Sequence, residues 1–346
     1  MTCDNPLRVG MVGLRNYAMV RRNMMREAGC YKMLACYNRS PEPMLECQKT
    51  EGAQPVSSYE ELVNFPGLEA MIISTGAKFH AEQTIMALKK GLHVYVEKPL
   101  CSTPDELREI VKLQKKTGLV VGVGHTDHFD DPVVMHTKKL IDAGELGTIV
   151  AIDGTTAHSG GQLIQEGDWR GDADKNPGGM LFQCGVHKLH EMMFLFGPIV
   201  RVQSFMRYDA NPKTKTADAA HCILQFKSGL TGTLNAYHIT PYYHAFNIFG
   251  TKATLYRESR YFDEGIWMYR QDVKHNQKEE RVKVAIPGLD TGKHHSPRSM
   301  LSFFDAIRKG GTVSPSLANG ANAVAVVFAA EESAKTGRAV DVDFFE

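Results

Sequence analysis

The chain has 346 residues, with 40 lysines and arginines against 39 aspartates and glutamates and no block of like charges, which argues against nucleic acid or an anionic membrane as a partner. No apolar stretch reaches the roughly 20 residues of a membrane span, and the first residues lack the basic and apolar segments of a leader peptide. The seven cysteines include no Cys-x-x-Cys pair, so we expect reduced thiols and a cytoplasmic protein.

The amino-terminal part alternates between short apolar strands and helical stretches. Such alternation predicts an α/β fold with a doubly wound parallel sheet, which we assign to a domain over residues 1–125. Thr103, Pro104 and the acids that follow have the pattern of a capped helix start. The expected strands are 7–13, 32–37, 70–74, 94–96 and 119–124, and the expected helices are 18–28, 41–50, a short one from Tyr59, 81–90 and one from Thr103.

The pattern changes after residue 125. A helix from about Pro132 to Ala143 precedes longer strands with alternating polarity, typical of an open, mostly antiparallel sheet with one face packed and the other available to substrate or to a second subunit. We assign residues 126–346 to a second α/β domain for substrate binding and oligomerisation. Its expected strands are 149–157, 200–208, 219–226, 231–238, 246–249 and 282–286, and its closing helices are 299–309 and 320–336.

The turn after the first strand resembles an imperfect dinucleotide loop. Such a loop needs glycines for a tight turn, for close approach of the pyrophosphate and for helix packing. Gly13 supplies the first, but Arg15 occupies the second position and Ala18 the third. Arg15 either contacts phosphate or obstructs it. We include Gly13, Arg15 and Asn16 among the expected cofactor contacts.

The end of the second strand carries Asn38, Arg39 and Ser40. An acid at this point holds the ribose 2′-hydroxyl of NAD, whereas an uncharged residue beside an arginine suits the 2′-phosphate of NADP. The sequence therefore favours NADP over NAD. The alternative is a polar turn that only caps the next helix.

Glu97-Lys98-Pro99 follows the buried strand 94–96 directly. Ligands of an open parallel sheet bind beyond the carboxyl ends of its strands, so this lysine is placed to reach a ligand. Pro99 restricts Lys98 to extended geometry, and a cis peptide bond here would aim its side chain. The alternative for an arbitrary lysine at a strand end is simple solvation.

A second polar cluster runs from Asp168 to Glu191. Trp169-Arg170 is followed by Gly178-Gly179 and then by Gln183 and His187, which are four residues apart and therefore neighbours on one helical face. The run His187-Lys188-Leu189-His190-Glu191 contains possible zinc ligands, but no third spaced ligand set accompanies it. We therefore expect no metal.

These motifs together resemble the glucose–fructose oxidoreductase / inositol dehydrogenase (Gfo/Idh/MocA) family over nearly the whole chain. The resemblance implies an amino-terminal Rossmann domain, a carboxy-terminal domain with an open sheet that forms dimers or tetramers, and hydride transfer between a nicotinamide and a secondary hydroxyl of a sugar or polyol. It rests on Gly13, Glu97-Lys98-Pro99, Trp169-Arg170, Gly178-Gly179 through Gly185 and His187, and the tail 333–340.

The resemblance also implies roles for single residues. His187 would be the acid/base, Lys98 would hydrogen-bond the reacting oxygen, and Gln183 would orient a neighbouring hydroxyl. The further contacts that we expect are Trp169, Arg170 and Tyr243 with the substrate, and Thr75, His80, Glu97 and Lys98 with the cofactor.

Three departures from the family pattern stand out. They are Arg15 in the loop, Gly76-Ala77 before His80, and Gln183 where many members have an aspartate. Tyr242, Tyr243 and His244 either line the sugar site or belong to the core of the sheet.

Three functions remain in view. The leading one is an NAD(P)-dependent dehydrogenase or reductase of a sugar, glycoside or cyclitol. A second is a glycoside-cleaving enzyme that oxidises its substrate only transiently. A third is a non-catalytic sensor of dinucleotide or sugar, which Arg15 and Gln183 keep open and which the presence of Lys98 and His187 opposes.

Overall fold

The computed structural model describes residues 4–259, 266–274, 279–289 and 296–345. By its packing, the chain divides into two units, Met1–Asp127 with His294–Ala321, and His128–Lys293 with Asn322–Glu346. The expected second domain began near this division, but it also included the described residues 296–321, which pack with the first unit.

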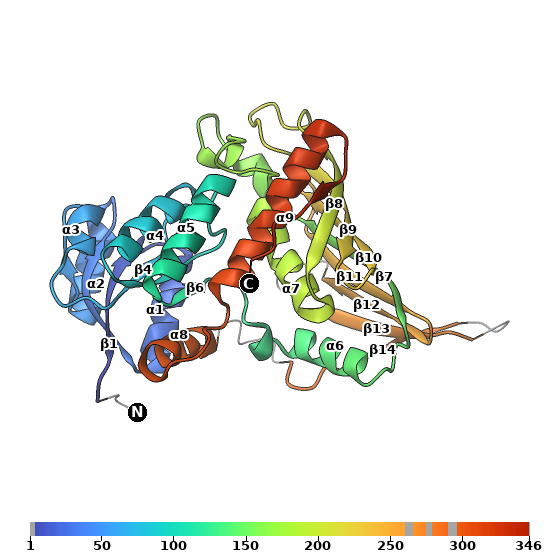
Figure 1. The fold of residues 1–346 in the computed structure, drawn as a ribbon, viewed down its shortest axis with the longest axis horizontal. Coiled ribbons are helices and arrows are strands. Elements are labelled where there is room, and N and C mark those ends of the chain that lie inside the picture. The colour runs from blue at the N-terminus through green and yellow to red at the C-terminus, as the bar shows by residue number, and fades with distance from the viewer. Residues whose placement is uncertain (1–3, 260–265, 275–278, 290–295, 346) are drawn as a thin grey trace. The chain divides into compact units, whose positions relative to one another are not determined.

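The sheet of the first unit is entirely parallel, with strand order β3-β2-β1-β4-β5-β6 (Figure 1). This confirms the doubly wound sheet that alternation predicted, although the two-residue strand β3 was not foreseen. The strands are β1 Leu7–Val12, β2 Tyr31–Tyr37, β3 Gln54–Pro55, β4 Ala70–Ile73, β5 His93–Val96 and β6 Val121–Val123.

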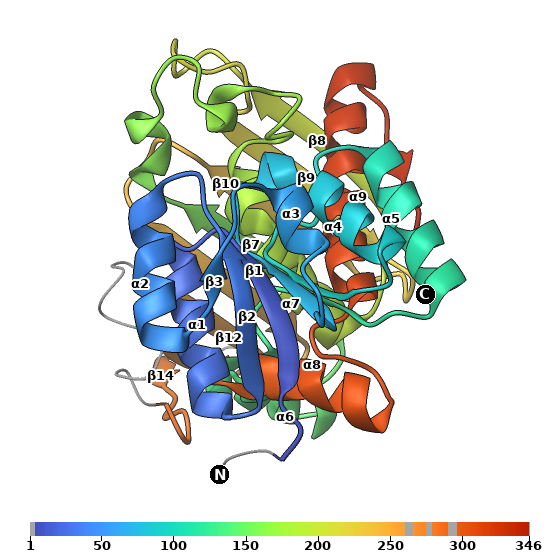
Figure 2. The same cartoon turned by 90° about the vertical axis from the view of Figure 1, so that its left-hand side faces the viewer.

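Helices cover both faces of this sheet (Figure 2). The core on one face joins apolar residues of β1 and β2 to residues of α1, α2 and α8, while α3, α4 and α5 lie on the other face. The predicted helix start at Thr103 is confirmed as a capping box with Glu106. The helices are α1 Tyr17–Ala28, α2 Pro41–Glu51, α3 Tyr59–Val63, α4 His80–Lys89, α5 Pro104–Thr117 and α8 Arg298–Lys309.

Helix α8 belongs to the first unit because its apolar side packs on α1 and on the sheet. The ring of Phe303 meets that of Tyr95 edge-on, with centroids 5.5 Å apart, and the Tyr31 hydroxyl donates to the carbonyl of Met300. Sequence alone gave no sign of this packing, since the contacts join residues far apart in the chain.

The second unit contains a nine-stranded sheet with order β14-β13-β12-β11-β7-β10-β9-β8-β15. Only the pair β7 and β10 is parallel among the pairings of the described strands. The mostly antiparallel sheet is therefore confirmed. The strands are β7 Ile149–Ala157, β8 Ile199–Arg207, β9 Ala219–Phe226, β10 Thr231–Tyr237, β11 Tyr243–Gly250, β12 Ala253–Ser259, β13 Trp267–Asp272, β14 Arg281–Lys283 and β15 Val340–Asp341.

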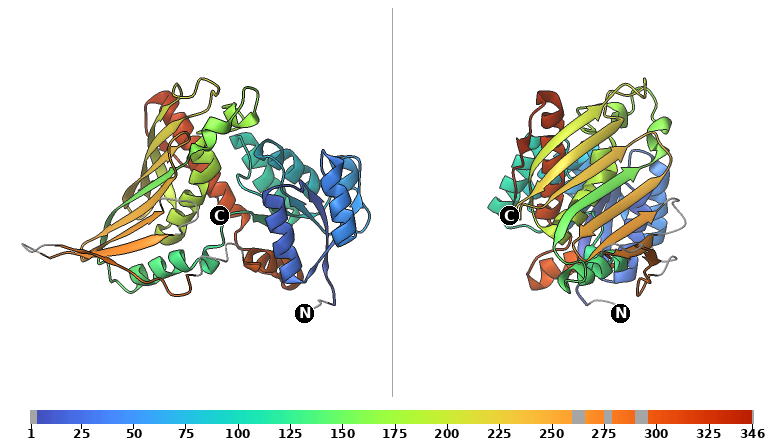
Figure 3. Two further views of the ribbon diagram at one scale, coloured as in Figure 1. Left: turned by 180° about the vertical axis from the view of Figure 1, so that it is seen from behind. Right: turned by 90° about the vertical axis from the view of Figure 1, so that its right-hand side faces the viewer.

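One face of this sheet is packed against helices and the other is open. Helices α7 (Val186–Phe196) and α9 (Leu317–Thr336) lie on the same side of it (Figure 1). Ser204 of β8 donates two hydrogen bonds to α9, from its amide to the Ser333 hydroxyl and from its own hydroxyl to the Ala330 carbonyl. Helix α6 (Pro132–Asp142) is tied to β12 by the bond from Arg257 to Thr137, 3.2 Å. On the opposite face (Figure 3, right), Val150, Phe205 and Ile223 are 61%, 68% and 56% exposed.

Within the described ranges, none of the helices is both long enough and apolar enough to cross a membrane.

Candidate active site

The carboxyl ends of the parallel strands bring several predicted cofactor residues to one edge of the first sheet. The amide of Gly13 donates to Tyr37 (3.1 Å), that of Ser74 to Val12 (2.8 Å) and that of Glu97 to Ile73 (2.9 Å). The segments that follow β1, β2, β4 and β5 therefore emerge side by side, at the edge where ligands bind in such sheets.

The loop after β1 is shaped for close approach of backbone. Gly13 has φ +77°, and a Cβ atom there would lie 2.5 Å from the Ser74 carbonyl oxygen, so a larger residue does not fit. Asn16 also has a left-handed φ of 56°, and α1 begins without a side-chain cap and without an acid in its first turn. An uncapped helix terminus of this kind offers backbone N–H groups and a positive dipole, which suits a pyrophosphate.

Arg15 and Asn38 are both engaged around this loop. The Arg15 guanidinium pairs with Glu42 at 3.2 Å on the surface. Asn38 accepts from the amide of Leu14 and donates to the carbonyl of Ser40, both at 3.2 Å. Asn38 thus fixes the shape of the loop, whereas the neighbouring Arg39 is exposed.

Glu97 is held by a buried arginine that sequence reasoning missed. Arg21 of α1 binds one carboxylate oxygen of Glu97 through Nε (2.9 Å) and Nη2 (2.8 Å), and donates to Tyr95 and Ser299 at 3.1 Å. Arg21 is 2% and Glu97 is 7% exposed. The segment that carries half-buried Lys98 is thereby anchored to α1, and the Lys98–Pro99 peptide is cis. The sequence did contain a signal that Arg21 is buried, because it lies on the same helical face as Ala18 and Met25.

His80 joins the segment after β4 to the segment after β5. Its Nδ1 lies 2.7 Å from the Pro99 carbonyl oxygen and its Nε2 lies 3.0 Å from that of Thr75. The ring is 1% exposed, and this burial lowers the pKa of His80. The Thr75 hydroxyl donates to Gln83 at 2.7 Å. His80 therefore supports the backbone on both sides of the expected cofactor position.

In the second unit, one edge of the sheet gathers histidines. Because β7 and β10 are parallel and β11 runs against β7, the residues after β7 and β10 and those at the start of β11 share an edge. His158 and His238 meet there with ring centroids 5.9 Å apart. The Thr156 hydroxyl lies 3.2 Å from Nδ1 of His244. Burial lowers the pKa of His238 and of His244 to about 4 in each case.

Gln183 and His187 lie on a chain segment that packs against β7 and β10. Residues Leu181–Gly185 form a turn of π-helix, and α7 follows at Val186. The predicted neighbour relation between Gln183 and His187 assumed an uninterrupted α-helix, so the π-turn changes their offset. Turns of this kind often occur at functional sites, and both side chains are half-buried here.

Trp169 and Arg170 form a short 3₁₀ turn, Trp169–Gly171, that Asp168 caps. The Arg170 guanidinium lies 5.0 Å from the centre of the Trp169 ring and 3.2 Å from the Asp168 carboxylate. The positive charge of Arg170 contributes to the low pKa of His238. This turn therefore lies near the histidine edge.

Strand alternation separates Tyr243 from His244. His244 shares a face of β11 with Phe246, whose ring meets Lys188 of α7 at 4.9 Å, so His244 faces the helices and Tyr243 points the other way. Tyr243 is 39% exposed. The ring of Tyr242 lies against that of His244, with centroids 4.6 Å apart. His244 therefore points toward α7, and Tyr243 does not.

His190 and Glu191 are used for packing and charge pairing. The His190 ring stacks on His128 at 4.2 Å, and Glu191 binds Lys188 (2.7 Å) and Arg257 (2.5 Å). These two cations contribute to the lowered pKa of Glu191. Among the residues that the structure describes, no group of three or more histidines, cysteines or acids is arranged to hold a metal.

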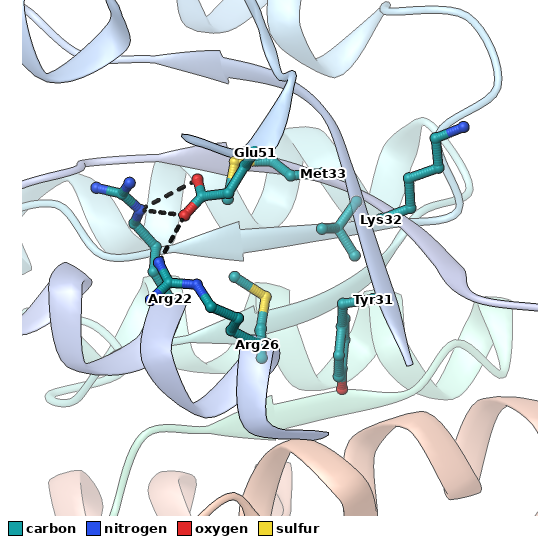
Figure 4. Close-up of a pocket in the computed structure, with 8 residues that line it drawn as sticks. Arg22, Arg26, Tyr31, Lys32, Met33 and Glu51 are labelled. Atoms are coloured by element: carbon teal, nitrogen blue, oxygen red, sulfur yellow. Dashed lines mark hydrogen bonds and ion pairs between the residues drawn. The ribbon is translucent and has the colours of Figure 1, made fainter. Parts of the chain in front are cut away.

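A pocket in the first unit lies away from these residues (Figure 4). It is lined by the second half of α1, the end of α2 and the start of β2, where Arg22 and Arg26 pair with Glu51 at 3.0 and 3.2 Å. It therefore occupies the opposite end of β2 from Asn38 and is not the expected cofactor site.

Two family models match separate parts of the chain. Residues 7–125 match the family model described as "Oxidoreductase family, NAD-binding Rossmann fold", and residues 134–256 match "GFO/IDH/MocA C-terminal domain". The chain belongs to the GFO/IDH/MocA oxidoreductase family. The resemblance inferred from its motifs is thereby confirmed, and the chain is a member of a family of NAD(P)-dependent oxidoreductases.

Individual relatives of this GFO/IDH/MocA protein include a cyclitol and a sugar enzyme. The chain is 29% identical to scyllo-inositol 2-dehydrogenase (NAD(+)) of Bacillus subtilis over 202 residues, 57% of each chain. It is 27% identical to 1,5-anhydro-D-fructose reductase of Ensifer adhaerens over 203 residues, 58% of this chain and 60% of the relative. These matches thus span less than two thirds of either relative.

A solved structure matches almost the whole chain. It is described as a candidate NADPH-dependent oxidoreductase from Desulfitobacterium hafniense DCB-2, with TM-score 0.86, 26% identity and 98% of both chains covered.

Proposed function

We propose that the protein transfers hydride between NADP or NAD and a secondary hydroxyl of a sugar, glycoside or cyclitol. The observation that carries this proposal is the edge of the first sheet, where Gly13, the uncapped start of α1 and Lys98 emerge together from adjacent parallel strands. The two named relatives of this protein, an inositol dehydrogenase and an anhydrofructose reductase, act on compounds of this class.

The residues present suit the two needs of alcohol oxidation. A nicotinamide cofactor, when bound, would supply the hydride acceptor for the carbinol carbon. The hydroxyl proton must leave as well, and we assign its acceptance to His187. Lys98 donates a hydrogen bond to the same oxygen and stabilises its developing negative charge.

Other residues position these groups. Gln183 hydrogen-bonds a neighbouring hydroxyl of the substrate, and Trp169 and Arg170 bound the substrate site. Glu97 and His80 act by holding the Lys98-Pro99 segment, since both are buried and bonded to protein groups.

Arg39 and Ser40 favour NADP as the cofactor. We expect Arg39→Ala to weaken NADPH binding about tenfold or more and to leave NADH binding within about twofold, because a hydrogen bond to a charged group contributes roughly 1.5–3 kcal/mol. Isothermal calorimetry of both cofactors measures this, and Lys49→Ala, at an exposed residue near the end of α2, is the matched control. Equal losses for NADPH and NADH would contradict the assignment.

A screen of sugars and cyclitols with the preferred cofactor tests the reaction itself. Reduced cofactor formed in proportion to product identifies a dehydrogenase, whereas cleaved glycoside without net reduction identifies the transient-oxidation alternative. Failure of both cofactors to bind would favour a regulator.

We further propose a cytoplasmic homodimer or homotetramer that uses the open face of the nine-stranded sheet. That face carries the exposed side chains of Val150, Phe205 and Ile223. Light scattering during size-exclusion chromatography measures the assembly, and a monomer of 38.4 kDa would exclude it.

A further inference from the structure

We propose that Cys184 is a reactive thiol that small uncharged electrophiles, hydrogen peroxide in particular, modify in the folded protein. The inference adds a modification site to the second unit. Its effect on catalysis rests on the function proposed above, but the chemistry of the thiol does not.

The contacts of His158 prepare the Cys184 sulfur for reaction. Nε2 of His158 lies 3.5 Å from Sγ of Cys184, and the amide N–H of Gly160 donates to Nδ1 of the same ring at 2.8 Å. Because Nδ1 accepts this bond, the proton of the neutral imidazole resides on Nε2 and points to the sulfur. A hydrogen bond to the charged form of an acid favours that form, so His158 stabilises the thiolate, which is the nucleophile.

Gly160 is needed for this ring position. A Cβ atom at residue 160 would lie 2.5 Å from Cε1 and 2.7 Å from Nδ1 of His158. Only glycine lets the imidazole lie against the backbone at this distance. The reactive cysteine thus has a donor, and the donor has its own orienting group, which is the pattern of an activated nucleophile.

Ionisable groups from neighbouring segments surround the pair. His238 and His244, from the ends of β10 and β11, face His158 and are neutral near pH 7, since their pKa values are about 4. Arg170 contributes to the low pKa of His238 and Lys188 to that of His244, and the two cations are themselves paired with Asp168 and Glu191. His187 lies three residues further along the same segment.

Exposure distinguishes Cys184 from the other cysteines. It is half-buried, whereas Cys30, Cys36, Cys47, Cys101 and Cys222, the remaining cysteines within the described ranges, are buried. Cys3 lies outside those ranges. Among these described cysteines, Cys184 is therefore the one that a reagent unable to enter the core meets first.

The reaction with peroxide is a two-electron oxidation. The thiol proton passes to water, the sulfur attacks one peroxide oxygen, the O–O bond breaks and hydroxide leaves. The sulfur becomes a sulfenic acid and the peroxide is reduced. Because Cys184 lies between Gln183 and His187, the added oxygen intrudes on the residues proposed to bind substrate.

Alkylation by iodoacetamide, mapped by peptide mass spectrometry, tests the thiol without any need for turnover. We expect Cys184 to react at least tenfold faster than Cys222 at pH 7. The variant His158→Phe should slow the alkylation of Cys184 at least fivefold at pH 7. At pH 9.5, where an ordinary thiol with a pKa of about 8.5 is already ionised, the same variant should slow it less than twofold. Gly160→Ala, which displaces the ring, should slow it likewise. Equal rates at pH 7 in the wild-type protein and both variants, or an unmodified Cys184, would overturn the proposal.

Peroxide treatment tests the consequence. Activity on the sugar substrate should fall and return with dithiothreitol, whereas the residual activity of Cys184→Ser should not respond. Retained activity in a protein whose Cys184 is fully oxidised would refute the inhibitory effect. If Cys184 is alkylated as expected but no cofactor-dependent reaction is found, the thiol site stands and the proposed function fails.

Discussion

Replacing Lys98 with methionine is expected to lower kcat by about 10²–10³-fold, because the variant loses the donor that stabilises charge on the reacting oxygen. Methionine keeps most of the length and apolar contact of the lysine stem. The affinity for the nicotinamide cofactor should change little. Steady-state kinetics on the identified substrate and calorimetry with cofactor measure the two quantities separately.

Lys90→Met provides the control for this experiment. Lys90 is an exposed residue at the end of α4 in the same unit, so its loss should leave both kcat and cofactor affinity unchanged. Turnover of Lys98→Met within about threefold of the control would remove Lys98 from the catalytic assignment.

Replacing Arg21 with methionine is expected to lower the free energy of unfolding by about 3–5 kcal/mol, because Glu97 would be left as a buried charge without its partner. Urea denaturation followed by circular dichroism measures this. The double variant Arg21→Met/Glu97→Gln should recover part of the loss, since it removes the charge as well.

Arg26→Met is the matched control on the same helix. Arg26 pairs with Glu51 but is 61% exposed in its side chain, and exposed pairs contribute about 0–1 kcal/mol. If Arg21→Met costs no more than this control, the buried pair does not anchor the Lys98 segment.

Local patterns were sufficient to predict most of the first sheet and its helices. Strands such as Ala70–Ile73 and Val94–Val96 are short apolar runs, and Thr103 with Glu106 is a local cap, so their signals lie within a few residues. The second sheet was predicted less completely, and β12, β13 and β15 were not among the expected strands. Arg257 interrupts the polarity of β12, and its burial depends on Glu191 in α7.

The candidate site shows the same division. Glycine, lysine and histidine positions could be read from motifs, but their supporting partners could not. Arg21 with Glu97 and His158 with Cys184 are joined only by the fold. The position of Arg21 on the apolar face of α1 indicates that it is buried, but nothing in its local sequence identifies Glu97 as its partner. The π-turn at Leu181–Gly185 likewise has no recognisable local sequence pattern.

The parallel pairing of β7 with β10 has a consequence for how such a protein diversifies. A parallel pair cannot be joined by a tight hairpin, so the chain makes a long excursion from Ala157 to Ile199, then adds β8 and β9 to the sheet, and only afterwards forms β10 beside β7. That excursion carries Trp169, Arg170, Gln183 and His187. From the roles proposed for these residues, we expect that exchanging this one segment between related enzymes transfers substrate preference, while the remaining strands and the cofactor unit keep their sequence.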